Sequence, residues 1–191
     1  MVRWEPDARG RLERAAMELY SERGFESTTV AEIAKRAGLT ERTFYRHFAD
    51  KREVLFSGSP MLSEILLTGV EEAPSSLPAI EAIASALARS AAMFDERREF
   101  ARRRQAIVAA NAELRERELI KLATLASVLT DALRRRGTPD PAASLAAEAG
   151  IAVFRIAFDR WTEDPGDQSL AHFIRESMEE LGAVTDPVRP S

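Results

Sequence analysis

The chain has 191 residues, of which 45% are hydrophobic and 30% charged, a balance that excludes a disordered or fibrous protein and allows a sizeable core. It contains no cysteine, which excludes disulfide bonds and thiol catalysis and suits a reducing compartment. No run approaches the roughly 18 apolar residues that span a bilayer, so we expect a cytoplasmic protein without a membrane partner.

The formal net charge of −4 is distributed unevenly along the chain. Residues 1–55 hold 11 Lys and Arg against 10 Asp and Glu, whereas the remaining residues hold 16 against 21. Within residues 34–52 there are six basic side chains and two acidic ones. A local group of cations on an acidic body predicts an anionic partner at one end of the protein, because clustered cations attract phosphates.

The residue pattern predicts an all-α fold, since Gly and Pro separate amphipathic segments and no alternating run marks a strand. Thr29 and Glu32 form a capping box that starts a helix, and Gly24 ends the helix before it. The helices expected near the N-terminus are 7–23, a second from Thr29, a short third after Thr40 and a fourth from about Asp50 and Lys51.

Breaks at 57–60 and 71–78 are expected to flank one further helix. The later helices are predicted at 78–94, 96–110, 112–136, 141–162 and 167–182. We therefore expect a DNA-binding domain over residues 1–52, a helical domain for ligand binding and dimerisation over 53–183, and a disordered tail over 184–191.

Two short helices joined by a tight turn need a small residue, a turn glycine and an apolar anchor, and Ala34, Gly38 and Phe44 supply them. At about 100° per residue, Phe48 lies near Phe44 on the helix surface and both are expected in the core. The opposite side of this helix carries polar and basic residues, namely Arg42, Thr43, Tyr45 and Arg46.

This outer face suits the major groove of DNA, because Arg pairs with guanine or phosphate and a Thr methyl contacts a thymine methyl. Thr29 and Lys51 begin the flanking helices and add donors for phosphates. Two plainer interpretations remain open: the arginines form a solvated helix face, and Tyr45 lies at the edge of the core.

The segment TTVAEIAKRAGLTERTFYRHFADKREVL, residues 28–55, resembles the DNA-binding signature of the TetR family of bacterial transcriptional regulators. The resemblance implies a homodimer that binds a short, nearly palindromic operator in double-stranded DNA through an N-terminal three-helix domain. It also implies that Glu41 and Arg46 set the sequence preference. The positions that match DNA contacts of the family are Thr29, Thr40, Arg42, Thr43, Tyr45, His47 and Lys51.

The last two predicted helices carry apolar stripes at helical spacing. Such stripes usually form the core of one chain, but the family resemblance favours a four-helix interface between two subunits. The stripe residues are Ile151, Phe154, Phe158 and Trp161, followed by Leu170, Ile174, Met178 and Leu181.

The block of residues 97–129 joins an Arg run, residues 102–104, to an apolar segment, and Asn111 is placed to cap a helix. It resembles the ligand domain of an acyl-CoA-responsive subgroup that includes the regulator of mycofactocin genes. An acyl chain needs an apolar tunnel and its CoA head needs cations. The plainer alternative is that these arginines are solvated or paired with Asp95, Glu96 and Glu99. The candidate ligand-binding residues are Phe94, Arg103, Ile107, Asn111, Leu122, Phe154 and Phe158.

These features predict a ligand-responsive transcriptional repressor that leaves its operator when a largely apolar effector binds, with acyl-CoA as a candidate. An activator of the same family and a helical adaptor without specific DNA binding are the alternatives. An enzyme is not expected, because the sequence has no nucleophile elbow and no phosphate-binding glycine loop, and its two histidines lie far apart. We expect no cofactor and no metal.

Overall fold

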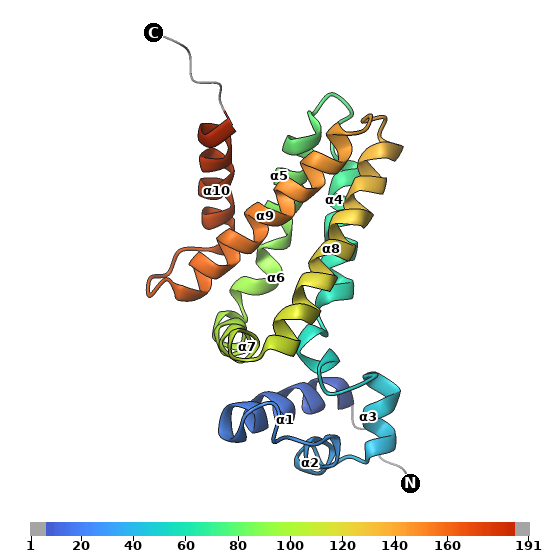
Figure 1. Cartoon of the computed structure of the whole chain (residues 1–191), viewed down its shortest axis with the longest axis vertical. Helices are drawn as coiled ribbons and strands as arrows, with labels where there is room; N and C mark the ends of the chain where they lie inside the picture. The colour runs from blue at the N-terminus through green and yellow to red at the C-terminus, as the bar shows by residue number, and fades with distance from the viewer. Residues whose placement is uncertain (1–6, 186–191) are drawn as a thin grey trace. The chain divides into compact units, whose positions relative to one another are not determined.

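The structure, a computed structural model, describes residues 7–185, and the regular elements in this range are all helical, as predicted (Figure 1). No helix in this range is long and apolar enough to cross a membrane. In chain order the elements are α1 (Ala8–Arg23), α2 (Val30–Arg36), α3 (Glu41–His47), the 3₁₀ helix η1 (Glu53–Phe56), α4 (Ser59–Glu72), α5 (Ala79–Ser90), α6 (Ala92–Asp95), α7 (Arg98–Ala110), α8 (Ala112–Arg135), α9 (Ala142–Glu163) and α10 (Leu170–Thr185).

The chain divides into two compact units. The N-terminal unit contains the described residues up to Gly58 together with Arg103–Glu118, and the C-terminal unit contains Ser59–Arg102 and the chain from Leu119 onward. Residues 53–58 and 103–118 therefore pack with the N-terminal unit, although the sequence grouped them with the second domain. The predicted functional boundary after residue 52 stays a prediction.

The first three helices of the N-terminal unit begin where the sequence predicts. Asp7 caps α1 through a 3.0 Å hydrogen bond from Gly10 N, and Gly24, with φ of 86°, ends that helix. At α2 the capping box is complete: Glu32 N donates to Thr29 Oγ1 at 3.2 Å and Thr29 N donates to Glu32 Oε2 at 2.9 Å. These caps fix the helix boundaries because they satisfy amides that have no partner inside the helix.

The helix expected from Asp50 and Lys51 is absent, and a turn followed by the 3₁₀ helix η1 takes its place. The Asp50 carboxylate accepts from Arg52 N at 2.8 Å and from Glu53 N at 3.2 Å, which closes the chain into a tight turn. Burial acts to raise the pKa of Asp50, but these bonds and the Arg52 guanidinium outweigh it and lower that pKa. The consecutive residues 54–56 are all buried.

Several helix boundaries in the C-terminal unit differ from the prediction. The segment expected as one helix over 78–94 is interrupted at Ala91, where Ala91 N bonds to Ala88 O at 3.3 Å, and no Gly or Pro marks this break. The last helix runs from Leu170 to Thr185, three residues beyond its expected end at 182. Residues 186–191 of the expected tail lie outside the described residues.

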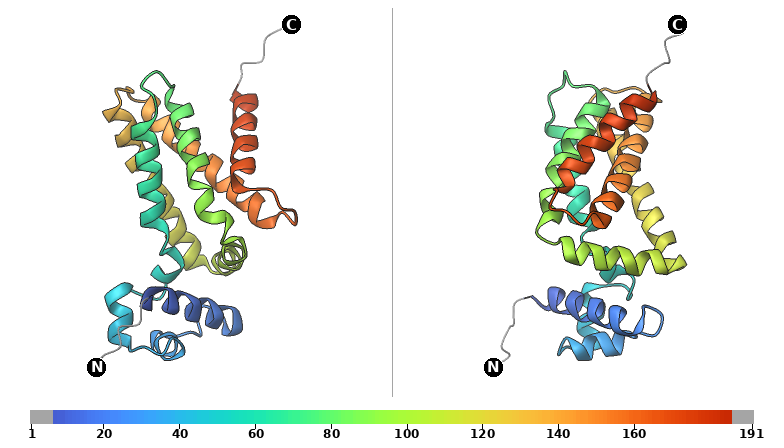
Figure 2. Two further views of the ribbon diagram at one scale, coloured as in Figure 1. Left: turned by 180° about the vertical axis from the view of Figure 1, so that it is seen from behind. Right: turned by 90° about the vertical axis from the view of Figure 1, so that its left-hand side faces the viewer.

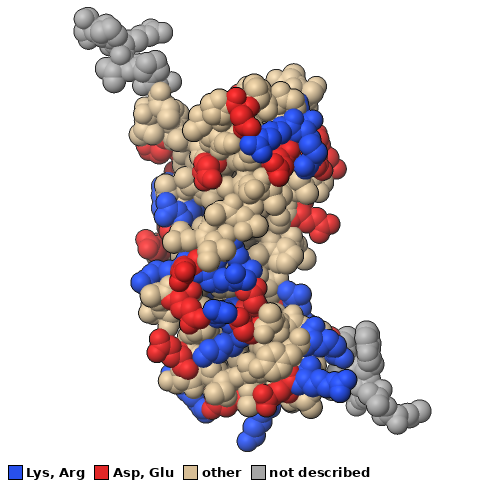
Figure 3. Space-filling model, turned by 45° about the vertical axis from the view of Figure 1, so that its right-hand side comes forward, with Lys and Arg blue, Asp and Glu red and all other residues tan. Residues whose placement is uncertain are grey.

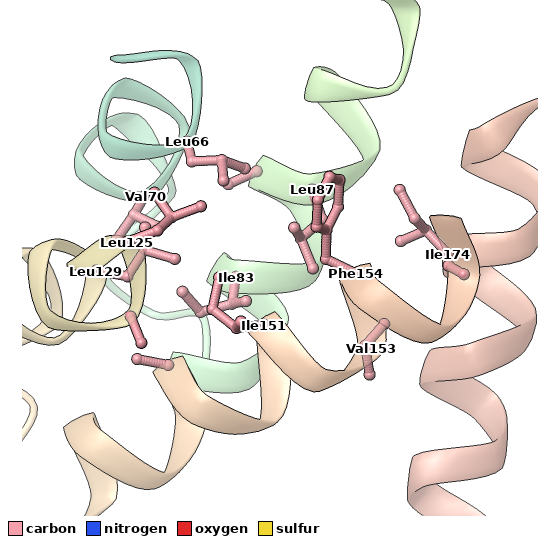
Figure 4. Packing of buried hydrophobic residues seen from close by; sticks show 14 of the residues in the cluster. Leu66, Val70, Ile83, Leu87, Leu125, Leu129, Ile151, Val153, Phe154 and Ile174 are labelled. Carbon is pink, nitrogen blue, oxygen red and sulfur yellow. The ribbon is translucent and has the colours of Figure 1, made fainter. Parts of the chain in front are cut away.

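In the C-terminal unit α5 packs against α4 and α9, while α10 packs against α9 and α5 (Figure 2). Their apolar faces form one cluster, shown in Figure 4 with Leu66 and Val70 from α4 and Ile83 and Leu87 from α5. Gly150 permits the approach of α9 to α5, because a Cβ at this position would lie 2.2 Å from Ile83 Cγ2.

The two stripes expected at a dimer interface belong mostly to this intramolecular core, so that prediction is wrong for these residues. On α9 none of the four stripe residues is more than 8% exposed, and on α10 Leu170 is 0% and Ile174 1% exposed. Met178 and Leu181 pack against the same cluster and are partly buried. The stripes are buried because the apolar sides of α9 and α10 face each other and α5 within one chain.

Candidate nucleic-acid interface

Helix α3 is anchored by two phenyl rings and presents its polar side to solvent. Phe44 is 0% and Phe48 4% exposed, and their ring centroids are 5.5 Å apart, which confirms both as core residues. Arg42, Tyr45 and Arg46 are exposed, and the Tyr45 side chain is 57% accessible. Tyr45 therefore does not lie at the edge of the core, which excludes that alternative.

The turn between α2 and α3 is held by a backbone hydrogen bond and by the side chain of one arginine. Leu39 N donates to Ala34 O at 2.8 Å, and Gly38 adopts φ of 67°, which favours glycine. The guanidinium of Arg11, a residue of α1, donates to Ala37 O. A Cβ at position 38 would lie 2.8 Å from Nη2 at the end of the Arg11 side chain, which would have to shift, so it is the positive φ of the turn that calls for the glycine predicted there.

Most cations of the N-terminal unit already have an acceptor. Arg36, for example, bonds to Glu18 at 3.2 Å and to Glu22 at 2.9 Å. Within the described part of this unit, the basic side chains without any hydrogen bond or ion pair are Lys35, Arg42 and Arg46. Figure 3 likewise shows basic and acidic groups interspersed on the face that it presents. An anion at the outer face of α3 would therefore meet two arginines without displacing an existing partner.

The two threonine hydroxyls at the helix starts act as caps. Thr40 Oγ1 accepts from Thr43 N at 3.2 Å and lies 3.1 Å from Thr43 Oγ1, and Thr29 Oγ1 accepts from Glu32 N. Hydrogen bonds from Thr29, backbone first, lower the pKa of Glu32. Each hydroxyl thus has a structural role in the absence of DNA, and any contact with a phosphate comes in addition to it.

Thr29→Ala is expected to destabilise the N-terminal unit by about 1 kcal/mol, the usual cost of losing an N-cap. Because the folded-state pKa of Glu32 is lowered, its stabilising contribution is present above its unfolded-state pKa and is lost as pH falls through the folded-state value. The effect of Thr29→Ala should therefore shrink in acid. Urea unfolding at neutral pH and near pH 3 measures it. Thr29→Ser is the matched control, and an equal loss of stability in this variant would contradict the capping role.

The remaining predicted DNA contacts differ in how available they are. Glu41 is exposed at the first turn of α3. His47 is half-buried, its ring centroid lies 6.5 Å from that of Phe48, and its Nε2 atom is buried without a hydrogen-bond partner in the described chain. Lys51 directs its ammonium at three backbone carbonyls of the loop between α1 and α2.

Four of the candidate effector residues lie in the C-terminal unit. Phe94, Phe154 and Phe158 form an aromatic group with centroid distances of 5.4 to 5.9 Å, and Phe158 also contacts Trp161 at 5.6 Å. Leu122 is partly buried and packs against the same core cluster. The structure therefore brings three of the predicted apolar residues together.

The other three candidates belong to the N-terminal unit. Ile107 is 9% exposed, and Asn111 Nδ2 donates to Ile107 O at 2.6 Å. The Asn111 side chain thus caps the end of α7 instead of the start of α8, which corrects the predicted N-cap. Arg103, the third candidate, is exposed on α7.

Arg98 and Arg102 have partners that the sequence did not predict. Arg98 Nη2 donates to Trp161 O at 2.8 Å and pairs with Asp164 at 3.1 Å, and Arg102 Nε donates to Thr162 O at 2.9 Å. These arginines satisfy carbonyls at the end of α9, where a helix favours cations. Arg98 and Arg102 are four residues apart, which places both on one face of α7. This spacing is the sequence signal that the two side chains bind the same segment.

Arg104 has a different role in the N-terminal unit. It donates to Leu55 O at 2.7 Å, pairs with Glu118 at 2.8 Å and lies 4.9 Å from the ring centroid of Phe56. The acceptors of Arg102 and Arg104 are thus other groups than the Asp95, Glu96 and Glu99 side chains considered for the run.

Two family models match the chain. Residues 13–57 match the model described as bacterial regulatory proteins of the tetR family, and residues 77–186 match the model of the MftR C-terminal domain. The first match includes α2 and α3 entirely, and the second covers more than half of the chain.

Curated relatives match over part of the chain. The transcriptional regulator TcmR of Streptomyces glaucescens is 37% identical over 78 residues, 41% of this chain and 34% of that protein. The transcriptional activator FasR of Mycolicibacterium smegmatis is 34% identical over 67 residues, 35% of this chain and 31% of FasR. The transcriptional repressor KstR2 of Mycobacterium tuberculosis is 43% identical over 47 residues, 25% of this chain and 24% of KstR2. The chain thus spans about a third or less of the length of these relatives.

Solved structures share the fold over nearly the whole chain. The repressor FadR of Thermus thermophilus in complex with lauroyl-CoA has a TM-score of 0.58 at 23% identity, covering 96% of this chain and 97% of FadR. FadR of Bacillus subtilis with stearoyl-CoA has a TM-score of 0.63 at 21% identity, covering 90% and 96%. SmeT, the Stenotrophomonas maltophilia efflux-pump repressor, has a TM-score of 0.62 at 20% identity in its triclosan complex, covering 96% and 99%.

Proposed function

This chain belongs to the TetR family of bacterial regulatory proteins, and from that premise we propose that it is a transcriptional repressor released from an operator by an apolar effector. One observation carries the DNA-binding part of the proposal. Helix α3 is fixed by two buried rings and exposes two arginines that have no partner in the described chain.

The proposed contacts follow from the chemistry of that face. Arg42 and Arg46 would pair with guanine edges or phosphates, and Glu41 would accept from a cytosine amino group or avoid phosphates. Hydroxyl and ring donors would fix the register of the protein on the DNA backbone. We assign that positioning role to Thr29, Thr40, Thr43, Tyr45 and His47.

We propose a homodimer, because two recognition helices must lie about 34–36 Å apart to enter successive major grooves. The side of α9 opposite to its buried stripe supports this. Leu145 is 66% and Ile156 49% exposed, and with the half-buried Ala149 and Ala152 they recur at intervals of four, three and four residues. An exposed apolar stripe of this spacing on a helix suits a helix from a second subunit.

The effector is proposed to be largely apolar, with acyl-CoA as the leading class. Two solved structures of this fold hold acyl-CoA thioesters and a third holds triclosan. In this chain the aromatic group of Phe94, Phe154 and Phe158 offers surface of the same character. A contact of Arg103 with the CoA phosphates stays a prediction from the sequence. An effector that prefers the DNA-free conformation by about 1–3 kcal/mol would release the operator, without covalent chemistry.

Activation in place of repression is the second candidate, since the relatives include the activator FasR as well as the repressor KstR2. The sign of regulation depends on where the operator lies relative to the promoter, which the fold does not determine. A regulator that acts on DNA would work in the cytoplasm. An adaptor without DNA binding is the remaining alternative, and it would show no salt-dependent affinity for duplexes.

The decisive experiment selects duplexes from a random library with the purified full chain and then challenges the complex with acyl-CoA of increasing chain length. The proposal predicts a near-palindrome and release by a narrow range of chain lengths. Triclosan and free CoA are the controls for general apolar binding and for the head group. If no sequence is enriched by the protein at low salt, the DNA-binding function is rejected. If none of the thioesters releases the operator, the effector class is rejected.

A further inference from the structure

The side chain of Lys51 turns back onto the loop that joins α1 to α2. Its Nζ atom lies 2.8 Å from Phe25 O, 2.8 Å from Thr28 O and 3.2 Å from Glu26 O. A lysine ammonium has three N–H donors and no acceptor. All three donors of Lys51 are therefore engaged by backbone carbonyls of a single loop.

The surroundings of the ammonium reinforce this position. It lies 4.4 Å from the ring centroid of Phe25, a buried residue, at a distance suited to a cation–π interaction. The Tyr20 hydroxyl donates to Lys51 O at 2.6 Å, and burial raises the pKa of Tyr20, so that this donor keeps its proton. Lys51 is thus held through its backbone as well as through its side chain.

The loop has contacts of its own: Thr28 N donates to Phe25 O at 3.3 Å, and the ring centroid of the buried Phe25 lies 5.3 Å from that of Tyr20. Gly24 breaks the helical path, and the buried Thr28 hydroxyl donates to Gly24 O at 2.9 Å. Carbonyls in the loop that converge on one point repel each other unless a cation lies between them. Because Thr28 directly precedes Thr29, holding Thr28 O fixes the place where α2 begins.

We propose that Lys51 is a positioning residue of the DNA interface: it holds the loop between α1 and α2, and with it Thr29, and does not donate to a phosphate. This inference rests on the proposed DNA-binding function. It replaces the phosphate contact that the sequence predicts for Lys51. The two roles differ measurably, because a lysine that neutralises a phosphate contributes about one unit to the salt dependence of binding and a positioning lysine contributes none.

The test compares Lys51→Met with Lys35→Met, which removes an equally charged, exposed lysine that has no partner in the described chain. In Lys51→Met we expect amide exchange of residues 25–29 to accelerate about tenfold or more in the absence of DNA. Operator affinity should fall about tenfold with the slope of log K against log salt unchanged. Lys35→Met should leave the exchange of this loop as in the wild type.

A slope reduced by about one unit with unchanged loop exchange would overturn the proposal and make Lys51 a phosphate ligand. Unchanged exchange with unchanged affinity would overturn it as well. Should Lys51→Met fail to fold, Lys51→Arg decides, because the larger, planar guanidinium keeps the charge but does not fit the position of the ammonium, which lies 2.8 Å from Phe25 O and Thr28 O and 4.4 Å from the Phe25 ring centroid. The proposal predicts faster exchange and weaker binding for Lys51→Arg, whereas a phosphate ligand predicts wild-type binding.

Failure of the proposed function would be recognised separately, since the wild-type chain would then show no sequence preference in duplex selection. The exchange measurements need no DNA. They decide on their own whether Lys51 holds the loop.

Discussion

Replacing Arg42 and Arg46 together with alanine is expected to weaken binding to the selected operator about 10²–10⁴-fold, with little change in the stability of the free protein. Each arginine that pairs with a base contributes about 1–3 kcal/mol of discrimination, and the two lie on the same exposed face. Neither side chain has a partner in the described structure, so their removal breaks no internal bond. Titration of labelled operator at several salt concentrations measures the affinity and its salt slope.

The matched control replaces Arg89 and Arg135, two exposed arginines of the C-terminal unit that pair with Glu72 and Glu71. It removes the same formal charge from the chain. We expect operator affinity close to that of the wild type, because surface ion pairs of this kind contribute little. If both double variants bind the operator as the wild type does, α3 is not the recognition helix.

Phe44→Ala is expected to destabilise the N-terminal unit by about 3–5 kcal/mol, which is a large fraction of the stability of a small unit. The ring is fully buried and contacts the rings of Tyr45 and Phe48 at centroid distances of 5.6 and 5.5 Å. Its loss would leave a cavity beneath α3 and free the helix to shift. Amide exchange of residues 41–48, together with urea unfolding, should report the loss.

Tyr45→Ala is the control for this experiment because Tyr45 is adjacent to Phe44 in the chain but 57% exposed. We expect its effect on stability to stay within about 0.5 kcal/mol, as is usual for surface substitutions, while operator binding weakens. Phe44→Leu should fall between the wild type and Phe44→Ala, since it retains most of the buried volume. Equal destabilisation by Phe44→Ala and Tyr45→Ala would contradict the anchoring role of Phe44.

The N-terminal unit could be predicted from sequence in detail because its determinants are local. The pair Thr29 and Glu32 marks a helix start through contacts three residues apart, and Gly24 and Gly38 meet backbone requirements that the neighbouring residues reveal. The inward face of α3 also follows from helical spacing alone. The structure confirms these features.

The partners of long side chains could not be predicted in the same way. Arg98 and Arg102 reach carbonyls about 60 residues away at the end of α9. Nothing near them in the chain identifies those acceptors. The same holds for Lys51, whose sequence position suggested an exposed donor but whose carbonyl acceptors belong to a loop more than 20 residues earlier.

The apolar stripes of α9 and α10 illustrate a second limit. Spacing identifies the apolar side of a helix, yet it does not distinguish burial within a subunit from burial between subunits. The buried residues of α9 proved to be intramolecular, and the exposed stripe from Leu145 to Ile156 lies on the other side. That second stripe is short and rich in alanine, so the spacing of large apolar residues did not predict it.

The neutralisation of most cations by neighbouring groups bears on how fast the protein would find its target. With a formal net charge of −4, the chain exerts little long-range attraction on a polyanion. Encounters with DNA would then proceed near the unsteered range, about 10⁵–10⁷ M⁻¹s⁻¹, and discrimination between sites would arise mainly from how long each complex survives. A slowly dissociating complex of this kind is well suited to control by an effector that shortens its lifetime.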